Sequence, residues 1–198
     1  NRLIGPLKAI VSAFPEVKIS VDTYRSKVAK AAIDAGAFMI NDISGGNLDE
    51  DMFSYIGTHN VPYVLMHMRG TPATMQSLTN YTNLVQDIKQ ELQTKIEILQ
   101  QKGARQIVID PGFGFAKTLD QNYELLKGLN QFQDLSTPIL VGVSRKSMIY
   151  KKLGSSAKEA LNGTTVLNTI ALSLGCNILR VHDVKEATEC IKISTFAK

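Results

Sequence analysis

The chain contains few of the residues that mark metal, redox and extracellular proteins. Its 198 residues include two cysteines, three histidines and no tryptophan. The spacing of Cys176 and Cys190 fits neither a zinc motif nor a Cys-x-x-Cys redox site. Free cysteines in this number are typical of a reducing compartment. We therefore expect a cytoplasmic protein.

Long apolar runs and concentrated charge are also lacking. No apolar run approaches the ~18 residues of a membrane helix, and the opening NRLIGPLKAI is amphipathic rather than a secretory signal. The net charge of +4 comes from Lys and Arg residues that are scattered along the chain. Scattered charge argues against nucleic acid as the main partner. We expect neither a membrane nor a nucleic acid as partner, whereas an anionic small substrate is compatible with this charge.

Short apolar runs alternate with longer helical patterns along the whole chain. The expected strands are 18–22, 38–42, 62–68, 106–110, 138–144 and 178–182. The expected helices are 2–14, 26–35, 49–59, 81–103, 121–132, 158–174 and 184–197. This alternation predicts an α/β fold with a parallel sheet.

The residues at the strand ends favour a closed barrel over an open sheet. No G-x-G-x-x-G turn comes after the first strand, and no Walker loop, zinc motif or readable Ser-His-Asp order is present. Instead, polar residues stand at every strand end: Asp22, Asn41-Asp42, His67, Asp110, 144–146 and 180–183. Such a ring is typical of a (β/α)₈ TIM barrel, whose active site lies at the strand C-termini.

The number of strands falls short of a closed barrel. Six strands are expected where eight are needed, and the chain opens on a helix that should follow a strand. We therefore expect residues 1–198 to form a single domain made of the C-terminal six βα units. The first two βα units are expected to be missing from this sequence.

Three of the strand-end residues suggest a flat heterocyclic ligand. Asp22 and Asp110 are hydrogen-bond acceptors, and Asn41 both donates and accepts. In one pocket they would match a ring with several N–H donors and one carbonyl, such as guanine or pterin. Taken singly, each acid is as readily a structural residue as a functional one. Three of them at barrel strand ends favour a site.

The stretch VIDPGFGFAKT, residues 108–118, places two phenylalanines beside one of these acids. Phe113 or Phe115 would lie against a flat ring bound by Asp110, with the glycines allowing close backbone approach. Both rings would alternatively fill the barrel mouth, and for Phe113 the two interpretations stay open. Met66 or Met68 would also pack against a flat ligand.

Cationic residues follow the last two strands. Lys146, in VGVSRKSM, would form a Schiff base, hold a substrate ring or neutralise an anion. In LRVHDV, strand alternation puts Arg180 and His182 on the same face, where this region of a barrel often binds phosphate. Asp183 is expected to cap the final helix. His67 is expected to orient its neighbours rather than touch a substrate.

Six motifs together resemble one family, the dihydropteroate synthases of folate synthesis, which sulfonamides inhibit. They are SVDTY, INDIS, LMHMRGTP, DPGFGF, SRKSM and RVHDV, in the family's order and covering essentially the whole chain. The resemblance implies a transferase that joins p-aminobenzoate to 6-hydroxymethyl-7,8-dihydropterin diphosphate. Its products would be 7,8-dihydropteroate and pyrophosphate, released in an SN1-like displacement that requires Mg²⁺.

The resemblance also implies which residues bind each part of the substrates. The expected pterin ligands are Asp22, Asn41, Asp110 and Lys146, with Met66 and Phe115 packing on the ring. The expected pyrophosphate ligands are Arg180 and His182, and Ser147 would border p-aminobenzoate together with Lys146 and Phe115. The catalytic set is expected to be Asp110, Lys146, Arg180 and His182.

The metal and the oligomeric state are expected from the same resemblance. The main Mg²⁺ ligand of the family is expected in the missing N-terminal segment, so this sequence supplies no metal ligand of its own. The helix expected at 158–174 is apolar on more than one face, and the family is similarly dimeric, which predicts a homodimer.

Other functions remain open at this point. A methyltetrahydrofolate methyltransferase working with a corrinoid partner would share the fold, but its substrate has no diphosphate for the basic motifs SRKSM and RVHDV. An aldolase would use Lys146 as a Schiff base. A non-catalytic pterin-binding fragment would keep the pocket without turnover.

Overall fold

A computed structural model describes residues 2–197 and contains six parallel strands in chain order. They are β1 (Ser20–Asp22), β2 (Met39–Asp42), β3 (Tyr63–Met66), β4 (Ile107–Asp110), β5 (Leu140–Val141) and β6 (Ile178–Leu179). The first four form one sheet and the last two another. A bridge between Ile109 and Ile139 links the two sheets. Each strand therefore lies next to its neighbour in the sequence, as the barrel prediction requires.

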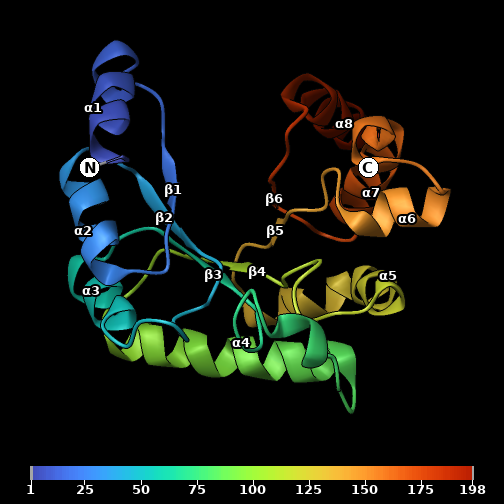
Figure 1. The fold of residues 1–198 in the computed structure, drawn as a ribbon, viewed down its shortest axis with the longest axis horizontal. Helices are drawn as coiled ribbons and strands as arrows, with labels where there is room; N and C mark the ends of the chain where they lie inside the picture. The colour runs from blue at the N-terminus through green and yellow to red at the C-terminus, as the bar shows by residue number, and fades with distance from the viewer. Residues whose placement is uncertain (1, 198) are drawn as a thin grey trace.

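Helices follow the strands and lie outside them, so that the described chain forms an open arc (Figure 1). They are α1 (Ile4–Ala13), α2 (Ser26–Asp34), α3 (Met52–His59), α4 (Leu84–Gln101), α5 (Leu119–Lys127), α6 (Ser147–Leu153), α7 (Leu161–Ser173) and α8 (Val184–Phe196). Short 3₁₀ turns are η1 (Met75–Ser77), η2 (Leu129–Leu135) and η3 (Ala157–Glu159). In residues 2–197, no helix is long and apolar enough to cross a membrane.

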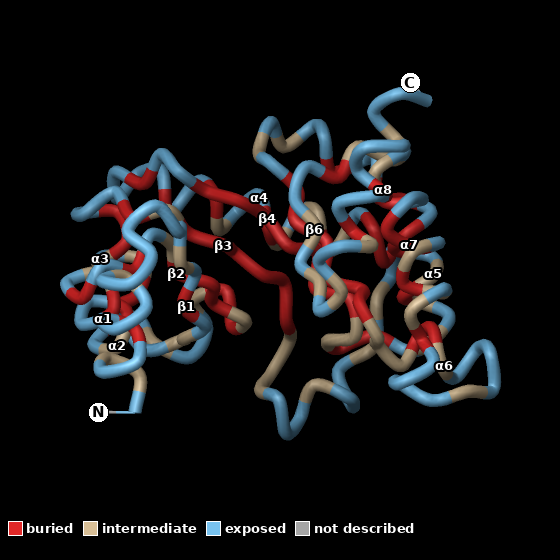
Figure 2. Tube along the Cα trace, turned by 90° about the horizontal axis from the view of Figure 1, so that it is seen from above, coloured by how far each residue is buried: buried red, intermediate tan, exposed pale blue. Residues whose placement is uncertain are grey.

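The centre of the arc is the most buried part of the fold. Every residue of β3 and β4 is buried, and Figure 2 shows these strands running through the middle of the molecule. Strands covered on both faces favour unbroken apolar runs such as YVLM and IVI. β1 and β6, at the two ends of the arc, contain exposed residues instead. The two central strands therefore lie in the buried middle of the arc, and the two outer strands lie at its open edges.

The structure departs from the expected helices in three places. The helix expected over 158–174 divides into η3 and α7. One helix was expected over 121–132, but the segment divides into α5 and η2 at Gly128. A Cβ at Gly128 would lie 2.6 Å from a methyl group of Val85, so close packing against α4 explains the glycine. The short helix α6 was not expected, although Gly154 ends it in the left-handed conformation that is typical of helix C-termini.

Candidate functional site

The parallel register brings the polar strand ends to one rim. Asp22 of β1 is the register partner of Asn41 in β2, and Met66 of β3 is the partner of Asp110 in β4. In parallel strands the carboxyl ends point the same way, so these four residues share one end of the sheet. The sequence-based placement of Asp22, Asn41 and Asp110 at a common rim agrees with the structure.

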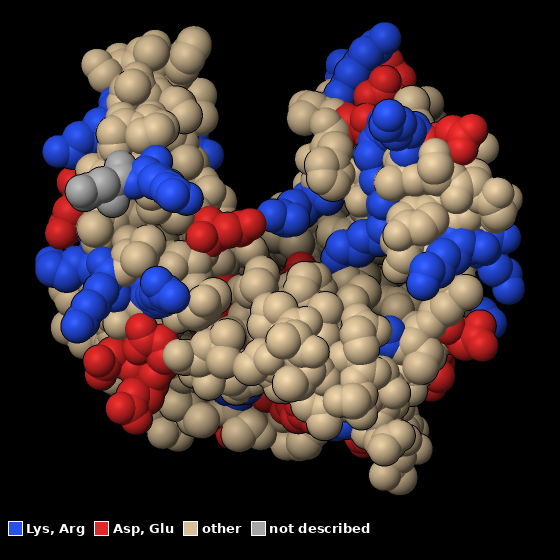
Figure 3. Space-filling view, in the orientation of Figure 1, with Lys and Arg blue, Asp and Glu red and all other residues tan. Residues whose placement is uncertain are grey.

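An outer cluster joins the two ends of the arc and consists of Asp22, Asn41 and Arg180. Nδ2 of Asn41 donates to Oδ1 of Asp22 at 2.6 Å. Nη2 of Arg180 donates to the other oxygen, Oδ2, at 2.7 Å. The side chains of Asp22 and Arg180 are each 54% exposed. This ion pair links the end of β1 to the residue after β6. Figure 3 shows that this face of the molecule is hollowed.

A deep cluster lies between β4 and the segment after β5 and consists of Asp110, Lys146 and Phe115. Asp110 is only 6% exposed, and its Oδ1 accepts from the backbone N–H of Gly112 at 2.8 Å. Nζ of Lys146 donates to the backbone carbonyl of Phe113. The same Nζ lies 5.0 Å from the ring centroid of Phe115. A carboxylate, an ammonium group and an aromatic face therefore meet in one partly enclosed place.

Burial shifts both ionisable groups of the deep cluster. It raises the pKa of the Asp110 carboxyl, while the positive charge of Lys146 acts in the opposite direction. It lowers the pKa of Lys146, which the charge of Asp110 opposes. Each charge thus offsets part of the cost of burying the other.

The two phenylalanines have different surroundings. Phe113 is completely buried in the hydrophobic core, so the interpretation as barrel-mouth packing is right for this ring. Phe115 is only partly buried and faces Lys146. Met66, 2% exposed, lies on the rim beside Asp110. Phe115 is therefore the loop ring that a ligand in the deep cluster would meet.

The segments that carry the remaining expected ligands are held together by polar contacts. Nδ1 of His182 lies 2.9 Å from Oγ of Ser144, and the backbone N–H of His182 donates to that oxygen at 3.2 Å. Arg180 instead pairs with Asp22. Ser147 begins α6 directly after Lys146 and is partly buried. The structure thus places Arg180 and His182 after the same strand but gives them different partners.

The prediction that Asp183 caps the last helix is wrong. Asp183 stands at the N-cap position of α8, but its side chain makes no capping hydrogen bond. Its two oxygens accept from Nε and Nη2 of Arg145 at 2.9 and 2.7 Å. A bidentate guanidinium–carboxylate pair makes two charge-assisted hydrogen bonds between opposite charges, whereas a cap would pair the carboxylate with an uncharged helix N–H. It ties the segment after β5 to the segment after β6.

Sequence reasoning missed two charged residues beside the deep cluster. Nζ of Lys117 is buried and lies 3.1 Å from Nδ1 of His67. Nε2 of His67 lies 3.1 Å from Oε2 of Glu91, a residue of α4 that also accepts from Nε of Arg69 at 3.0 Å. The position of Lys117 directly after the glycine-rich loop was the signal available, but lysine after a loop is usually solvated. Spacing within α4 gave no sign that Glu91 turns toward the rim.

This group has strongly shifted pKa values. Burial lowers the pKa of His67 to about 4, although Glu91 acts in the opposite direction, so the ring is neutral near pH 7. For Glu91, burial raises the pKa, but hydrogen bonds from His67 and Arg69 outweigh it and bring the pKa down to about 2. His67 therefore lies between Lys117 and Glu91 as a neutral ring.

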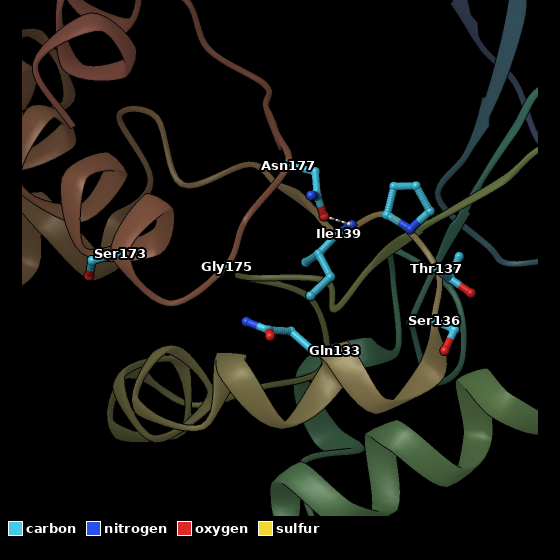
Figure 4. A pocket seen from close by; sticks show the side chains of 8 residues that line it. Gln133, Ser136, Thr137, Ile139, Ser173, Gly175 and Asn177 are labelled. Carbon is cyan, nitrogen blue, oxygen red and sulfur yellow. Dashed lines mark hydrogen bonds between the residues drawn. The ribbon is translucent and has the colours of Figure 1, made fainter. Parts of the chain in front are cut away.

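A separate pocket lies at the opposite end of the strands. It has a volume of about 540 Å³ and is lined by residues before β5 and β6, including Gln133, Thr137 and Asn177. Figure 4 shows the Asn177 side chain turned toward Ile139, whose N–H it accepts at 2.8 Å. The lining contains no charged side chain. Because barrel enzymes work at the strand C-termini, the rim and not this pocket is the candidate site.

Comparison with known proteins identifies the class of this rim. The family model described as "Pterin binding enzyme" matches residues 1–182. A dihydropteroate synthase of Synechocystis is 41% identical over 182 residues, which cover 90% of this chain and 63% of that protein. A dihydropteroate synthase of Clostridium beijerinckii is 40% identical over 197 residues, covering 98% of this chain and 70% of its own length.

Solved structures give the same result for the fold. A dihydropteroate synthase from Clostridium difficile, crystallised in the presence of pteroic acid, has a TM-score of 0.92 and 35% identity, with 99% of this chain and 73% of that chain covered. The Yersinia pestis dihydropteroate synthase in complex with a sulfonamide drug has a TM-score of 0.94 and 35% identity, with 99% and 72% covered.

The chain therefore belongs to the pterin binding enzyme family, whose members with this fold are TIM barrels. Within that family it is a member of the dihydropteroate synthases. The predicted fold class and the predicted family are both confirmed. The chain spans about two thirds of the length of the two bacterial relatives, 63% of one and 70% of the other.

Proposed function

We propose that this chain carries the pterin and p-aminobenzoate site of a dihydropteroate synthase. The reaction would join p-aminobenzoate to 6-hydroxymethyl-7,8-dihydropterin diphosphate and release 7,8-dihydropteroate and pyrophosphate. The observation that supports it most is the deep cluster, where Asp110, Lys146 and Phe115 combine charge and a flat aromatic face. Related structures in complex with 4-aminobenzoate and with 6HMPPP are consistent with this assignment.

The pterin ring would lie between the deep and outer clusters. Its amidine edge donates two parallel N–H groups, which a carboxylate accepts well. Asp110 is the buried candidate for this contact, and Asp22 with Asn41 offers further acceptors and a donor at the rim. Met66 and Phe115 would pack on the ring faces. Because Asp110 is shielded from water, its charge acts strongly on a cation that develops on the pterin.

Pyrophosphate would leave toward the segment after β6. Arg180 and His182 supply donors there, and preorganised donors stabilise charge as it develops on the leaving group. Arg180 is already bonded to Asp22, so pyrophosphate would share that guanidinium with the carboxylate. Loss of pyrophosphate before attack gives a delocalised pterin-methylene cation, which explains an SN1-like order.

p-Aminobenzoate would approach past Phe115, Lys146 and Ser147. Lys146 lies over the Phe115 ring at 5.0 Å, and Ser147 begins α6 next to it. Attack by the arylamine nitrogen on the cation forms the C–N bond, and the protonated adduct then releases one proton to water. No strong general base is needed, because the lone pair of an aniline nitrogen is available and its protonated adduct is acidic. Asp110, Lys146, Arg180 and His182 are the proposed catalytic set.

In residues 2–197, no three or more His, Cys, Asp or Glu side chains are arranged to hold a metal ion. The Mg²⁺ requirement remains a prediction from the family, with its main ligand expected outside this sequence.

The assembly proposed around this chain has three further features. Two more βα units would pair with the open edges at β1 and β6 and complete one eight-unit domain. Of the domain expected over 1–198, residues 1 and 198 lie outside the described residues. A homodimer is supported by the exposed Val166 and Ile170 on α7. A cytoplasmic location is supported by the free cysteines Cys176 and Cys190.

The decisive experiment measures pyrophosphate release from dihydropterin diphosphate and Mg²⁺, with and without p-aminobenzoate. Release that depends on p-aminobenzoate establishes the synthase. Pterin binding without release by both this chain and its complete natural protein would instead establish a pterin-binding protein without turnover. If borohydride reduction links a carbonyl substrate covalently to Lys146, the protein would be a Schiff-base aldolase and the proposal would be wrong.

A further inference from the structure

The loop after β4, residues 111–116, turns repeatedly and is called the aromatic loop here. Gly112, Gly114 and Ala116 have φ values of +76°, +82° and +49°. The backbone N–H of Phe115 donates to the carbonyl of Gly112 at 3.1 Å. A buried segment that is neither helix nor strand leaves carbonyl groups that need other donors. The aromatic loop therefore depends on side chains for its shape.

Lys117 supplies those donors from beneath the loop. Its side chain is buried, with 3% of the residue exposed. Nζ donates to the carbonyls of Gly112 and Phe115, each at 3.0 Å, and to Nδ1 of His67 at 3.1 Å. An ammonium group has three protons, and each has one acceptor here. All three N–H donors of Lys117 therefore bond to the aromatic loop and to His67.

Lys146 and Lys117 bond to different carbonyl groups of the aromatic loop. Lys146 binds the carbonyl of Phe113, and Lys117 binds the carbonyl of Phe115. The Phe115 ring faces Lys146 at 5.0 Å. The backbone of Phe115 is therefore fixed by one lysine, and its ring lies against the other.

The contacts of Lys117 continue to the outer helix α4. Because Nδ1 of His67 accepts from Lys117, the proton of the neutral ring sits on Nε2, which donates to Glu91. Glu91 is held in turn by Arg69. The aromatic loop is thereby anchored to a long helix rather than to solvent.

We propose that Lys117 is a positioning residue, which sets the orientation of Phe115 and of the aromatic loop for the bound pterin without touching it. The inference rests on the proposed function for the identity of the ligand. It adds a residue that no ligand contact would reveal, because Lys117 lies behind the loop.

The charge of Lys117 supports this role. Burial lowers its pKa to about 7, against the opposing effect of Asp110. A neutral amine has two protons, so one of the three acceptors loses its donor as the pH rises through that value. The charged and titratable groups that face Lys117 are His67 and Arg69 after β3, Glu91 of α4, Asp110 of β4 and Lys146 before α6. We expect pterin affinity to fall between pH 6 and pH 8.

The test measures binding of 6-hydroxymethylpterin by calorimetry to the complete natural protein and its variants. Lys117→Met keeps the length of the side chain and removes the donors, and should weaken binding by about tenfold to a hundredfold at pH 6. Lys117→Arg should recover part of the loss. The matched control is Lys95→Met, because Lys95 is another partly buried lysine and bonds Asn47 instead of the loop. It should change binding little.

A double-mutant cycle separates positioning from general stability. If Lys117 acts through Phe115, adding Lys117→Met to Phe115→Ala should cost much less affinity than it costs alone. The fall in pterin affinity between pH 6 and pH 8 should also disappear in Lys117→Met. Titration of the ligand itself affects all variants equally, so a difference between variants comes from the protein. Full additivity, or unchanged binding by Lys117→Met, would overturn the inference.

Two other outcomes also decide the question. If Lys117→Met does not fold, two other measurements decide: pterin binding by Lys117→Arg, and the pH dependence of pterin binding by the unsubstituted protein and by Lys95→Met. Pterin affinity that does not change with pH, together with unchanged binding by Lys117→Arg, would count against the inference. Failure of the proposed function looks different, because the unsubstituted protein would then bind no pterin at all.

Discussion

The two carboxylates of the rim, Asp110 and Asp22, differ in almost everything except their place at a strand end. Asp110 is 6% exposed, accepts a hydrogen bond from a backbone N–H and lies near the buried Lys117 and the partly buried Lys146. The Asp22 side chain is 54% exposed and is bonded to Asn41 and Arg180. One belongs to the crowded middle of the arc and the other to its open edge.

The difference shows where a strand-end acid has most effect. Interactions in a water-poor environment are stronger than at the surface, and an unpaired charge there costs more. The deep cluster is therefore preorganised by the fold, whereas the outer cluster depends on one exposed ion pair between distant parts of the chain. We expect the deep cluster to dominate affinity and the outer cluster to adjust it.

The largest effect is expected for Asp110→Asn. The variant keeps the shape but removes the buried charge, so pterin affinity should fall about a hundredfold, or 2–3 kcal/mol. Calorimetry with 6-hydroxymethylpterin measures this loss. Unchanged pterin binding would show that Asp110 is not a pterin ligand and that the deep cluster does not dominate affinity.

Lys146→Ala should lower turnover by about thirtyfold, or ~2 kcal/mol, because the cation beside the ligand is lost. The melting temperature should change little, since removing a partly buried ammonium group also removes the cost of its desolvation. Pyrophosphate release and thermal melts give the two values. A large fall in melting temperature with normal turnover would make Lys146 structural.

A smaller effect is expected for Asp22→Asn in the outer cluster. The exposed pair with Arg180 contributes only about 0–1 kcal/mol to stability, and pterin affinity should fall about fivefold, or 1 kcal/mol. The same calorimetric titration as for Asp110→Asn allows direct comparison. A loss as large as that of Asp110→Asn would show that exposure does not separate the two clusters.

The smallest effect is expected for Glu91→Gln, measured as a pH-dependent shift in melting temperature. The pKa of Glu91 in the folded protein, about 2, lies below its ordinary value of 4.5. Its stabilising effect is therefore present above pH 4.5 and is lost as the pH falls through 2. The unsubstituted protein should melt higher than the variant at pH 7, and the difference should narrow below pH 4.5. A difference that widens on acidification would contradict this sign.

Much of the rim was predictable because the relevant signals are local. An acid directly after a buried apolar run, as at Asp110, must lie where the strand leaves the core. Parallel strands then bring Asp22 and Asn41 to the same end, whatever the details of the helices. The barrel followed from the same positions together with the absence of a glycine-rich nucleotide turn.

The contacts that hold the rim were not predictable in the same way. Lys117 points inward only because the aromatic loop turns through three left-handed residues before it, and spacing does not encode that path. Asp183 stands at the N-cap position of α8 as its sequence position suggests, but both of its oxygens accept from Arg145 instead. Such choices depend on distances between segments that are far apart in the chain.

The order of the strands has a consequence for how the chain folds. Every strand pairs with the one before or after it in sequence, so structure can spread from one unit to the next as in repeat proteins. The exception is the Asp22–Arg180 pair, whose partners are 158 residues apart. Bringing them together requires closure of almost the whole chain, which costs loop entropy before it yields any contact. We expect this pair to form last in refolding, so that Asp22→Asn should speed unfolding while leaving the refolding rate nearly unchanged.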